Sequence, residues 1–163
     1  MPELVKYRNW VFEVDRSKTE SLYDKVKLSG TESCGCGQCK EFIALKDIIY
    51  PQEIKELFKK LGVDIYKEFE LCDHGNEEYG HVYSWWFHFV GKIIEGDDCN
   101  ISLPESDYTR NTLAINDLFS IGFTKDISIS FFNNYQDLIQ VELFAKVPWN
   151  KPDIIEKIKT VYN

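Results

Sequence analysis

The chain has 163 residues, of which 44% are hydrophobic and 15% aromatic, and it carries a formal net charge of −8. This length and composition predict a single folded domain over residues 1–163 and exclude a disordered body. The negative charge and the scattered lysines and arginines disfavour nucleic acid and anionic membrane surfaces, so neither is expected as a partner.

Neither a signal peptide nor a membrane span is expected. The first ten residues, MPELVKYRNW, carry charges where a signal peptide has its apolar segment. The longest apolar runs are too short to cross a bilayer. The five cysteines are an odd number, so they cannot all pair with one another. We therefore expect a reduced, cytoplasmic protein, in which clustered cysteines favour metal or redox chemistry over disulfides.

The chain is expected to begin with a strand. Trp10, Phe12 and Val14 alternate with mainly polar residues, which predicts a strand with one wet face. Residues 15–21 break this pattern, and the stretch up to Gly30 receives no assignment.

Two helices should follow. Apolar residues at helical spacing predict the first within residues 39–49. The second is expected to start at Pro51, which suits a first turn, and to stop at Gly62. Its last turn carries two lysines, as the helix dipole favours. The expected buried stripes are Phe42, Leu45, Ile48 and Ile49 in the first helix, and Ile54, Leu57, Phe58 and Leu61 in the second.

The second half is predicted to be mainly β-structure. Residues 64–73 and 79–96 are expected to be strands joined at HGNEE, the segment 74–78. In the second of them both faces are rich in apolar residues, which predicts a central strand or a face covered by helices. Residues 97–110 are expected to be a polar loop, and 112–123 are ambiguous.

Two more strands and a helix complete the prediction. The strands are expected at 126–132 and 138–147. In the last strand Gln140, Glu142 and Lys146 alternate with apolar residues, so they are expected on a solvent face, where Glu142→Lys would change stability little. A helix should start near Pro152. The order predicts a single-domain α+β fold, with a mainly antiparallel sheet packed by helices or curled toward a sandwich.

Several motifs give the chain a resemblance. The chain resembles a bacterial family of small uncharacterised proteins that carry a domain of unknown function. The stretches that carry the resemblance are CGCGQCKEF, LGVD, YGHVYSWWFHFVGKI and IQVELFAKVPW. In that family a C-x-C-x-x-C cluster, a YP-helix-LGID step, a YHFVG-type strand and a C-terminal PW recur. The resemblance covers most of the chain. It implies a fold and no mechanism.

The cysteine cluster is the candidate site. Cys36 and Cys39 have the two-residue spacing that lets one turn present two sulfurs to one ion, and Cys34 can supply a third. Gly35 and Gly37 permit the backbone angles of such a turn. Cys72 and His74 are the candidates that would complete a zinc shell. A second C-x-x-C pair, which would make the pattern specific, is absent from the sequence.

Two other interpretations stay open. Cys39 is expected near the start of a helix, where a thiolate is stabilised, so the cluster can be a thiol-redox site. The preceding segment is no hydrophobic strand, as a thioredoxin-like motif would require. Alternatively, the cysteines are small apolar residues in a compact glycine turn, without zinc or another cofactor. Cys99 lies in the expected loop and is assigned no role.

No catalytic residue is proposed from the sequence. His81 and His88 fall on opposite faces of one strand and cannot converge on one ligand, and His88 is expected to be a core residue. If the even face of that strand is open, Ser84, Trp86 and His88 form a surface for a small molecule or a protein. The sequence thus favours a binding or interaction domain with a cysteine-rich turn, and the alternative is a zinc-binding or thiol-redox protein.

Overall fold

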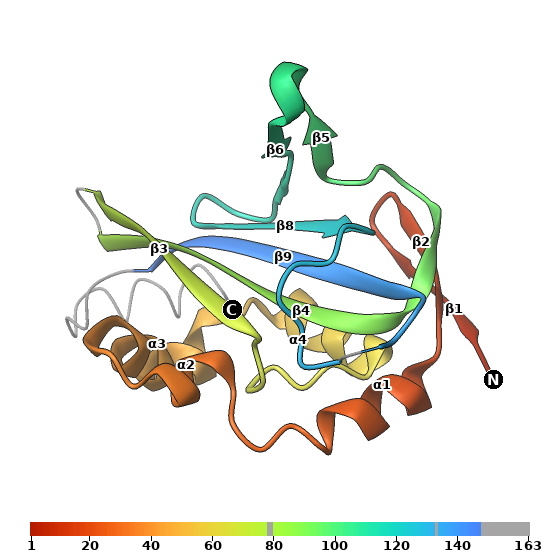
Figure 1. Cartoon of the computed structure of the whole chain (residues 1–163), viewed down its shortest axis with the longest axis horizontal. Helices are drawn as coiled ribbons and strands as arrows, with labels where there is room; N and C mark the ends of the chain where they lie inside the picture. Colours follow the sequence, from red (N-terminus) through yellow and green to blue (C-terminus); the bar gives the residue numbers. More distant parts are fainter. Residues whose placement is uncertain (78–79, 133, 148–163) are drawn as a thin grey trace.

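Alternating apolar residues build a long antiparallel sheet, and four helices are packed below it in Figure 1. The computed structural model describes residues 1–77, 80–132 and 134–147. It confirms the predicted α+β class with a mainly antiparallel sheet. The helix expected from Pro152 lies outside the described residues.

The main sheet has seven strands. Six of them follow the order β1-β2-β4-β9-β8-β7, in which β2 pairs with the C-terminal part of the long β4, and the seventh, β3, pairs with the N-terminal part of β4. A separate two-stranded sheet, β5-β6, forms an arm that projects from the sheet (Figure 1). The strands are β1 Glu3–Tyr7, β2 Trp10–Val14, β3 Glu70–Glu77, β4 Gly80–Glu95, β5 Asn100–Ser102, β6 Tyr108–Arg110, β7 Leu113–Ala114, β8 Phe119–Thr124 and β9 Leu138–Val147.

The helices precede β3 in the chain and share one side of the sheet. The two that the sequence predicts, α3 and α4, bury the expected apolar stripes, except that Ile48 is half-buried. Pro51 is the N-cap of α4, and Gly62 ends it with a left-handed φ of 77°. The helices are α1 Arg16–Tyr23, α2 Gly30–Cys34, α3 Gly37–Ile49 and α4 Gln52–Leu61, and a short 3₁₀ turn, η1, spans Pro104–Ser106.

Aromatic contacts bind the helices to the odd-numbered face of β4. Phe42 of α3 packs edge-on against Trp85, with ring centroids 5.0 Å apart, and Phe58 of α4 packs against Phe87 at 4.9 Å. Each such pair adds about 0.5–1.5 kcal/mol beyond its buried area. The prediction for β4, a central strand or one with a face covered by helices, holds in both respects: β4 lies between β2 and β9, and the helices cover one of its faces.

The first strand and the assignment of 15–30 need correction. The N-terminal segment is a hairpin of β1 and β2, which turns at Arg8 with a φ of 52°. Trp10, Phe12 and Val14 are buried as expected. The next residues contain α1 and α2, which are too short and too polar to show a clear apolar period.

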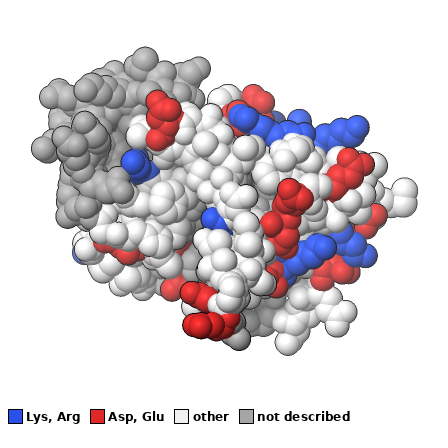
Figure 2. Space-filling view, turned by 90° about the horizontal axis from the view of Figure 1, so that it is seen from above, with Lys and Arg blue, Asp and Glu red and all other residues white. Residues whose placement is uncertain are grey.

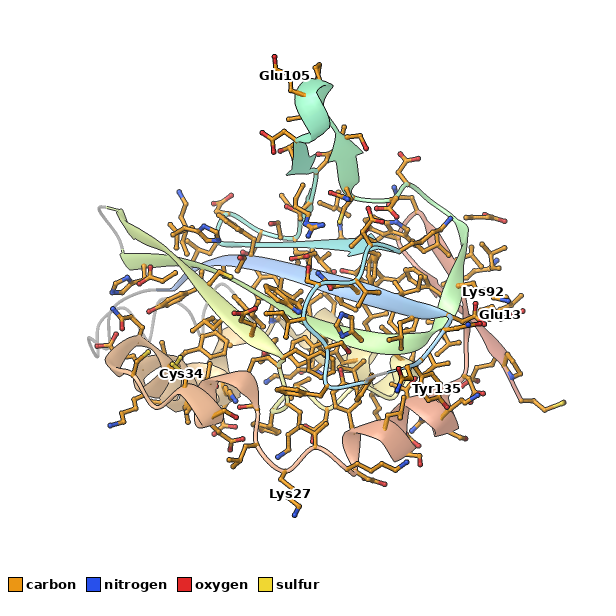
Figure 3. The ribbon with its side chains drawn as sticks, in the orientation of Figure 1. Glu13, Lys27, Cys34, Lys92, Glu105 and Tyr135 are labelled. Carbon is orange, nitrogen blue, oxygen red and sulfur yellow. The ribbon has the colours of Figure 1, made fainter. Side chains whose placement is uncertain are left out.

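The arm replaces the loop expected at 97–110. Cys99 is buried at its base, and the backbone N–H of Cys99 donates to the carbonyl of Phe123. Figure 3 shows Glu105 at the tip of the arm, while Cys34 lies among the helices on the opposite side of the sheet. The arm thereby reaches away from the body, and its last residue, Arg110, returns to the sheet.

The strand expected at 126–132 is not formed. The N–H of Ser128 donates to Oε1 of Gln140, and the N–H of Phe132 donates to Oγ of Ser130. Because side chains satisfy these backbone groups, the segment lies as an irregular strap over the sheet.

The same strap covers part of the polar side of β9, while Phe144 is exposed and Lys146 half-buried farther along the strand. Gln140 is 0% exposed and Glu142 is 7% exposed, so the expected solvent face is wrong at these two positions, and Glu142→Lys is instead expected to destabilise the fold. A lysine there would face Arg110, whose Nη2 lies 3.1 Å from Oε1 of Glu142. Like charges at that distance repel.

Charged side chains are not sorted by sign on the surface seen in Figure 2. Acidic and basic groups are interspersed there, and much of the surface between them is uncharged. Among the described residues, none of the helices has the length and apolar character needed to cross a bilayer.

Candidate metal site

The three clustered cysteines lie at the junction between the end of α2 and the start of α3. Cys34 is the last residue of α2, and Gly35 ends that helix in the left-handed conformation with a φ of 67°. Cys36 is the N-cap of α3, and Cys39 is the third residue of that helix. Gly35 therefore provides the sharp reversal, because most side chains disfavour a positive φ.

The turn is held against the sheet by the start of α2. Ser29 and Glu32 form a capping box, in which each side chain bonds the backbone N–H of the other residue. A Cβ atom at Gly30 would lie 2.2 Å from the carbonyl oxygen of Phe69. Only glycine allows this approach, so α2 sits directly on the segment that leads into β3.

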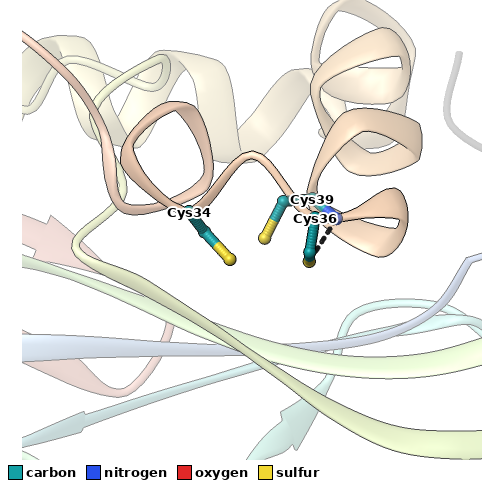
Figure 4. Close-up of side chains that lie close together, drawn as sticks. All are labelled: Cys34, Cys36 and Cys39. Carbon is teal, nitrogen blue, oxygen red and sulfur yellow. Dashed lines mark hydrogen bonds between the residues drawn. The ribbon is translucent and has the colours of Figure 1, made fainter.

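The three sulfurs converge. Their Sγ atoms all lie within 4.8 Å of one another, and Figure 4 shows the side chains pointing to the same side of the turn. Sulfurs bound to one tetrahedral zinc ion at about 2.3 Å would be roughly 3.8 Å apart. Small rotations of the side chains therefore suffice for three thiolates to hold an ion such as zinc.

The thiols differ in their surroundings. Cys36 is exposed, and its Sγ accepts a hydrogen bond from the Cys39 N–H at 3.5 Å. This backbone bond, followed by contacts with the Cys39 and Cys34 thiols, lowers the pKa of Cys36. Cys39 is buried, and burial together with the neighbouring thiols raises its pKa to about 12. A cation at the cluster would stabilise the thiolate form that Cys39 otherwise resists.

A buried hydroxyl group lies within electrostatic range of the cluster. Tyr83 of β4 is 1% exposed, and its hydroxyl has no hydrogen-bond partner in the described part of the chain. Burial raises the pKa of Tyr83, and the negative charges of Asp73, Glu41, Cys39 and Cys36 raise it further. A buried hydroxyl without a partner costs about 1–3 kcal/mol.

Cys72 and His74 are placed elsewhere. In the described residues the group of metal-ligating atoms contains Cys34, Cys36 and Cys39 but neither of these two. Cys72 pairs in register with Ser84, on the face of the sheet that points away from α3. Cys72 and His74 line a pocket there, and Nε2 of His74 lies 2.7 Å from Oγ of Ser84.

The strand histidines occupy opposite faces, as predicted. His81 stacks on Tyr83 with ring centroids 5.3 Å apart. His88 is 0% exposed, and its Nε2 lies 2.8 Å from Oε1 of Gln140. His88 also packs against Phe69, at a centroid distance of 4.6 Å. This confirms His88 as a core residue rather than part of an open surface.

Burial lowers the pKa of His88 from 6.5 to about 4, and the bond to Gln140 only partly opposes this shift. Between about pH 4 and pH 6.5, therefore, the His88 side chain is protonated in the unfolded chain and neutral in the folded protein. Stability from this group is full above pH 6.5 and is lost as the pH falls toward 4. The slope reaches about 1.4 kcal/mol per pH unit.

Urea unfolding at several pH values tests this expectation. His88→Gln should have a smaller loss of stability between pH 6.5 and 4 than the wild type. His74→Gln, at an exposed histidine, should keep the wild-type dependence. Equal slopes for His88→Gln and the wild type would show that His88 is not buried in its neutral form.

No protein-family model matches the chain, and no curated protein or solved structure matches it either. The resemblance to a bacterial family of small proteins therefore stays a prediction from the motifs alone. The converging cysteines are the feature from which a function has to be argued.

Proposed function

We propose that this protein is a binding module whose Cys34, Cys36 and Cys39 together hold one zinc ion. The observation that carries the proposal is the approach of the three Sγ atoms to within 4.8 Å of one another. Thiolates are preferred zinc ligands, and a C-x-C-x-x-C turn delivers three of them from one short stretch of chain.

The ligand count indicates an accessible site. Structural zinc sites usually have four protein ligands, whereas sites that exchange a ligand have three and leave one position open. The cluster offers three cysteines among the described residues, and two of these are exposed. We infer that a water molecule or an external donor takes the fourth position. The Tyr83 hydroxyl, buried and without a partner among the described residues, lies within electrostatic range of Cys36 and Cys39, so an ion there would act on it as well.

Zinc analysis of the purified protein tests the proposal. We expect one zinc ion per chain after zinc loading and desalting. Cys36→Ser or Cys39→Ser should weaken zinc binding at least about 100-fold, since the loss of a residue that only hydrogen-bonds a metal ligand already costs 10–100-fold. Cys72→Ser is the matched control and should keep its zinc, because Cys72 lies on the other face of the sheet.

Chelation gives an independent measurement. A metal that binds only the folded state stabilises it by about 3 kcal/mol at a zinc concentration of roughly 100 times Kd. A chelator should therefore lower the melting temperature of the wild type and of Cys72→Ser, and leave Cys36→Ser unchanged. A zinc-free protein with three freely reacting thiols and no chelator effect would contradict the proposal and favour the simple glycine turn.

Thiol-redox chemistry is the second candidate, favoured by the contrast between exposed Cys36 and buried Cys39 in one C-x-x-C turn. In that reaction both thiols lose their protons, and two electrons pass to a small-molecule disulfide, which is reduced to two thiols. Mass spectrometry with and without glutathione disulfide separates the two functions. A Cys36–Cys39 disulfide in a protein that takes up no zinc would select the redox candidate.

A further inference from the structure

A second pocket lies on the face of the sheet that the helices leave free, at the base of the arm. It has a volume of about 550 Å³, within the range of about 300–1,000 Å³ that is typical of small-molecule sites. Strands β3, β4 and β9 provide its floor, and β6 with the strap at Ser128 closes its sides. This pocket is separate from the cysteine turn, so binding in it does not depend on zinc.

The floor of the pocket contains a buried carboxylate, that of Glu142. Glu142 is 7% exposed in the middle of the sheet, and burial raises its pKa. Arg110 and the side-chain amide of Gln140 both donate to its Oε1. Neither bond involves Oε2, for which the described residues show no hydrogen-bond donor, so this oxygen can accept from a ligand. A buried, partly satisfied carboxylate in a pocket is a typical feature of a binding site.

An aromatic wall stands beside this carboxylate. Trp86 is the cross-strand partner of Glu142, and its indole N–H donates to the carbonyl of Ile129 at 2.9 Å, which fixes the ring. Phe144 is 37% exposed on the same face, and the His74 ring lies 5.7 Å from it. The wall therefore presents rigid ring surfaces at the pocket, close to hydrogen-bonding groups.

Hydroxyl groups supply most of the remaining polar lining. Ser84 is the cross-strand partner of Phe144 and its hydroxyl lies 2.7 Å from Nε2 of His74, and the Thr112 hydroxyl lies 2.8 Å from that of Ser120. Ser128 accepts from Nε2 of Gln140 at 3.2 Å. Each hydroxyl can both donate and accept. These groups can therefore adapt to a ligand that carries hydroxyl groups of its own.

The charges and polarity select the class of ligand. Arg110 and Glu142 neutralise each other, so the pocket offers no net charge to attract an anion or a cation. A purely apolar ligand would strip water from Ser84, Glu142 and the threonines without replacing its hydrogen bonds. A ring with apolar C–H faces and several hydroxyl groups satisfies both the aromatic wall and the polar floor.

We propose that this pocket binds a small neutral carbohydrate, a mono- or disaccharide, which lies against Trp86 and bonds Glu142 and Ser84 through its hydroxyl groups. Two variants probe the contacts without changing the volume of the pocket greatly. Glu142→Gln removes the charged acceptor, and Ser84→Ala removes one hydroxyl. Glu105→Gln makes the same chemical change as the first at the tip of the arm, away from the pocket (Figure 3).

Saturation-transfer NMR with glucose, galactose, mannose, xylose, N-acetylglucosamine, maltose and cellobiose provides the test, followed by calorimetry on the sugar that binds best. We expect Glu142→Gln to weaken binding at least about tenfold, as for the loss of a charged hydrogen bond. Ser84→Ala should weaken it several-fold, and Glu105→Gln and Cys36→Ser should leave it unchanged. Thermal melts identify a variant that has not folded, and the other variant then decides. If the wild type binds no sugar of this panel, or both pocket variants bind as the wild type does, the proposal is overturned.

Discussion

Replacing Leu143 with aspartate is expected to unfold the protein. Leu143 is 0% exposed in β9, and its cross-strand neighbours are Trp85 of β4 and Ile121 of β8. Aspartate leaves a cavity where the leucine methyl groups were and places a carboxylate in apolar surroundings. The two effects together cost about 5 kcal/mol or more. Folded domains have only about 5–15 kcal/mol of stability in total.

Urea unfolding followed by circular dichroism measures this loss. Leu4→Asp makes the same chemical change at a position on β1 that is 67% exposed. It should alter the free energy of unfolding by no more than about 0.5 kcal/mol. If the two variants unfold at similar urea concentrations, Leu143 does not face the core.

Replacing Lys46 with methionine is expected to be nearly as damaging. Its Nζ lies 2.7 Å from Oε2 of Glu68, and both side chains are almost fully buried. The same Nζ donates to Oγ of Ser29 and to the carbonyl of Tyr66. Without the ammonium group, the Glu68 carboxylate is left buried without its counter-charge. Breaking one side of such a pair costs about 3–5 kcal/mol.

The double variant Lys46→Met, Glu68→Gln identifies the cause. It removes the stranded charge, and the amide oxygen of Gln can still accept the bonds that Thr31 donates to Glu68. It should recover about half of the lost stability or more, because buried pairs replaced on both sides are often neutral. Arg16→Met, at an exposed ion pair with Glu20, should cost about 0.5 kcal/mol or less. A double variant no more stable than Lys46→Met would show that the stranded charge is not the cause of the loss.

This ion pair also connects the fold to the cysteine site. Lys46 belongs to α3, Ser29 caps α2, and Glu68 lies in the segment before β3. The pair therefore ties together the two helices whose junction carries Cys34 and Cys36. A weaker zinc affinity in Lys46→Met than in Arg16→Met would be the expected consequence.

Strong local signals made part of the fold predictable. Pro51, Gly62 and an apolar stripe define α4, and alternation defines β4 and β9. Helix α2 was not predicted, because a helix of five residues is too short to show an apolar period. Ser29 and Glu32, however, have the spacing of a capping box and mark its start. The 126–132 segment alternates like a strand, but its amide groups bond side chains of distant or neighbouring residues, which local pattern does not encode.

The candidate site was likewise predictable only where its residues are close in sequence. The turn spacing of Cys34, Cys36 and Cys39 is local, and the structure brings these three together. Whether Cys72 and His74 join them depends on which face of β3 they occupy, and that is set by the register with Ser84. The pairing of Glu142 with Arg110 depends on how the arm returns to the sheet, so the alternation of β9 could not reveal the polar pocket.

X-ray absorption at the zinc edge of the zinc-loaded protein is the sharpest test of the proposed zinc site, because it counts the sulfur atoms around the ion. We predict three sulfurs at about 2.3 Å and one lighter atom at about 2.0–2.1 Å. Cys39→Ser should reduce the count to two, and Cys72→Ser should leave it at three. A spectrum with no sulfur around the zinc, or a sulfur count that falls in Cys72→Ser and not in Cys39→Ser, would contradict a zinc ion held by Cys34, Cys36 and Cys39.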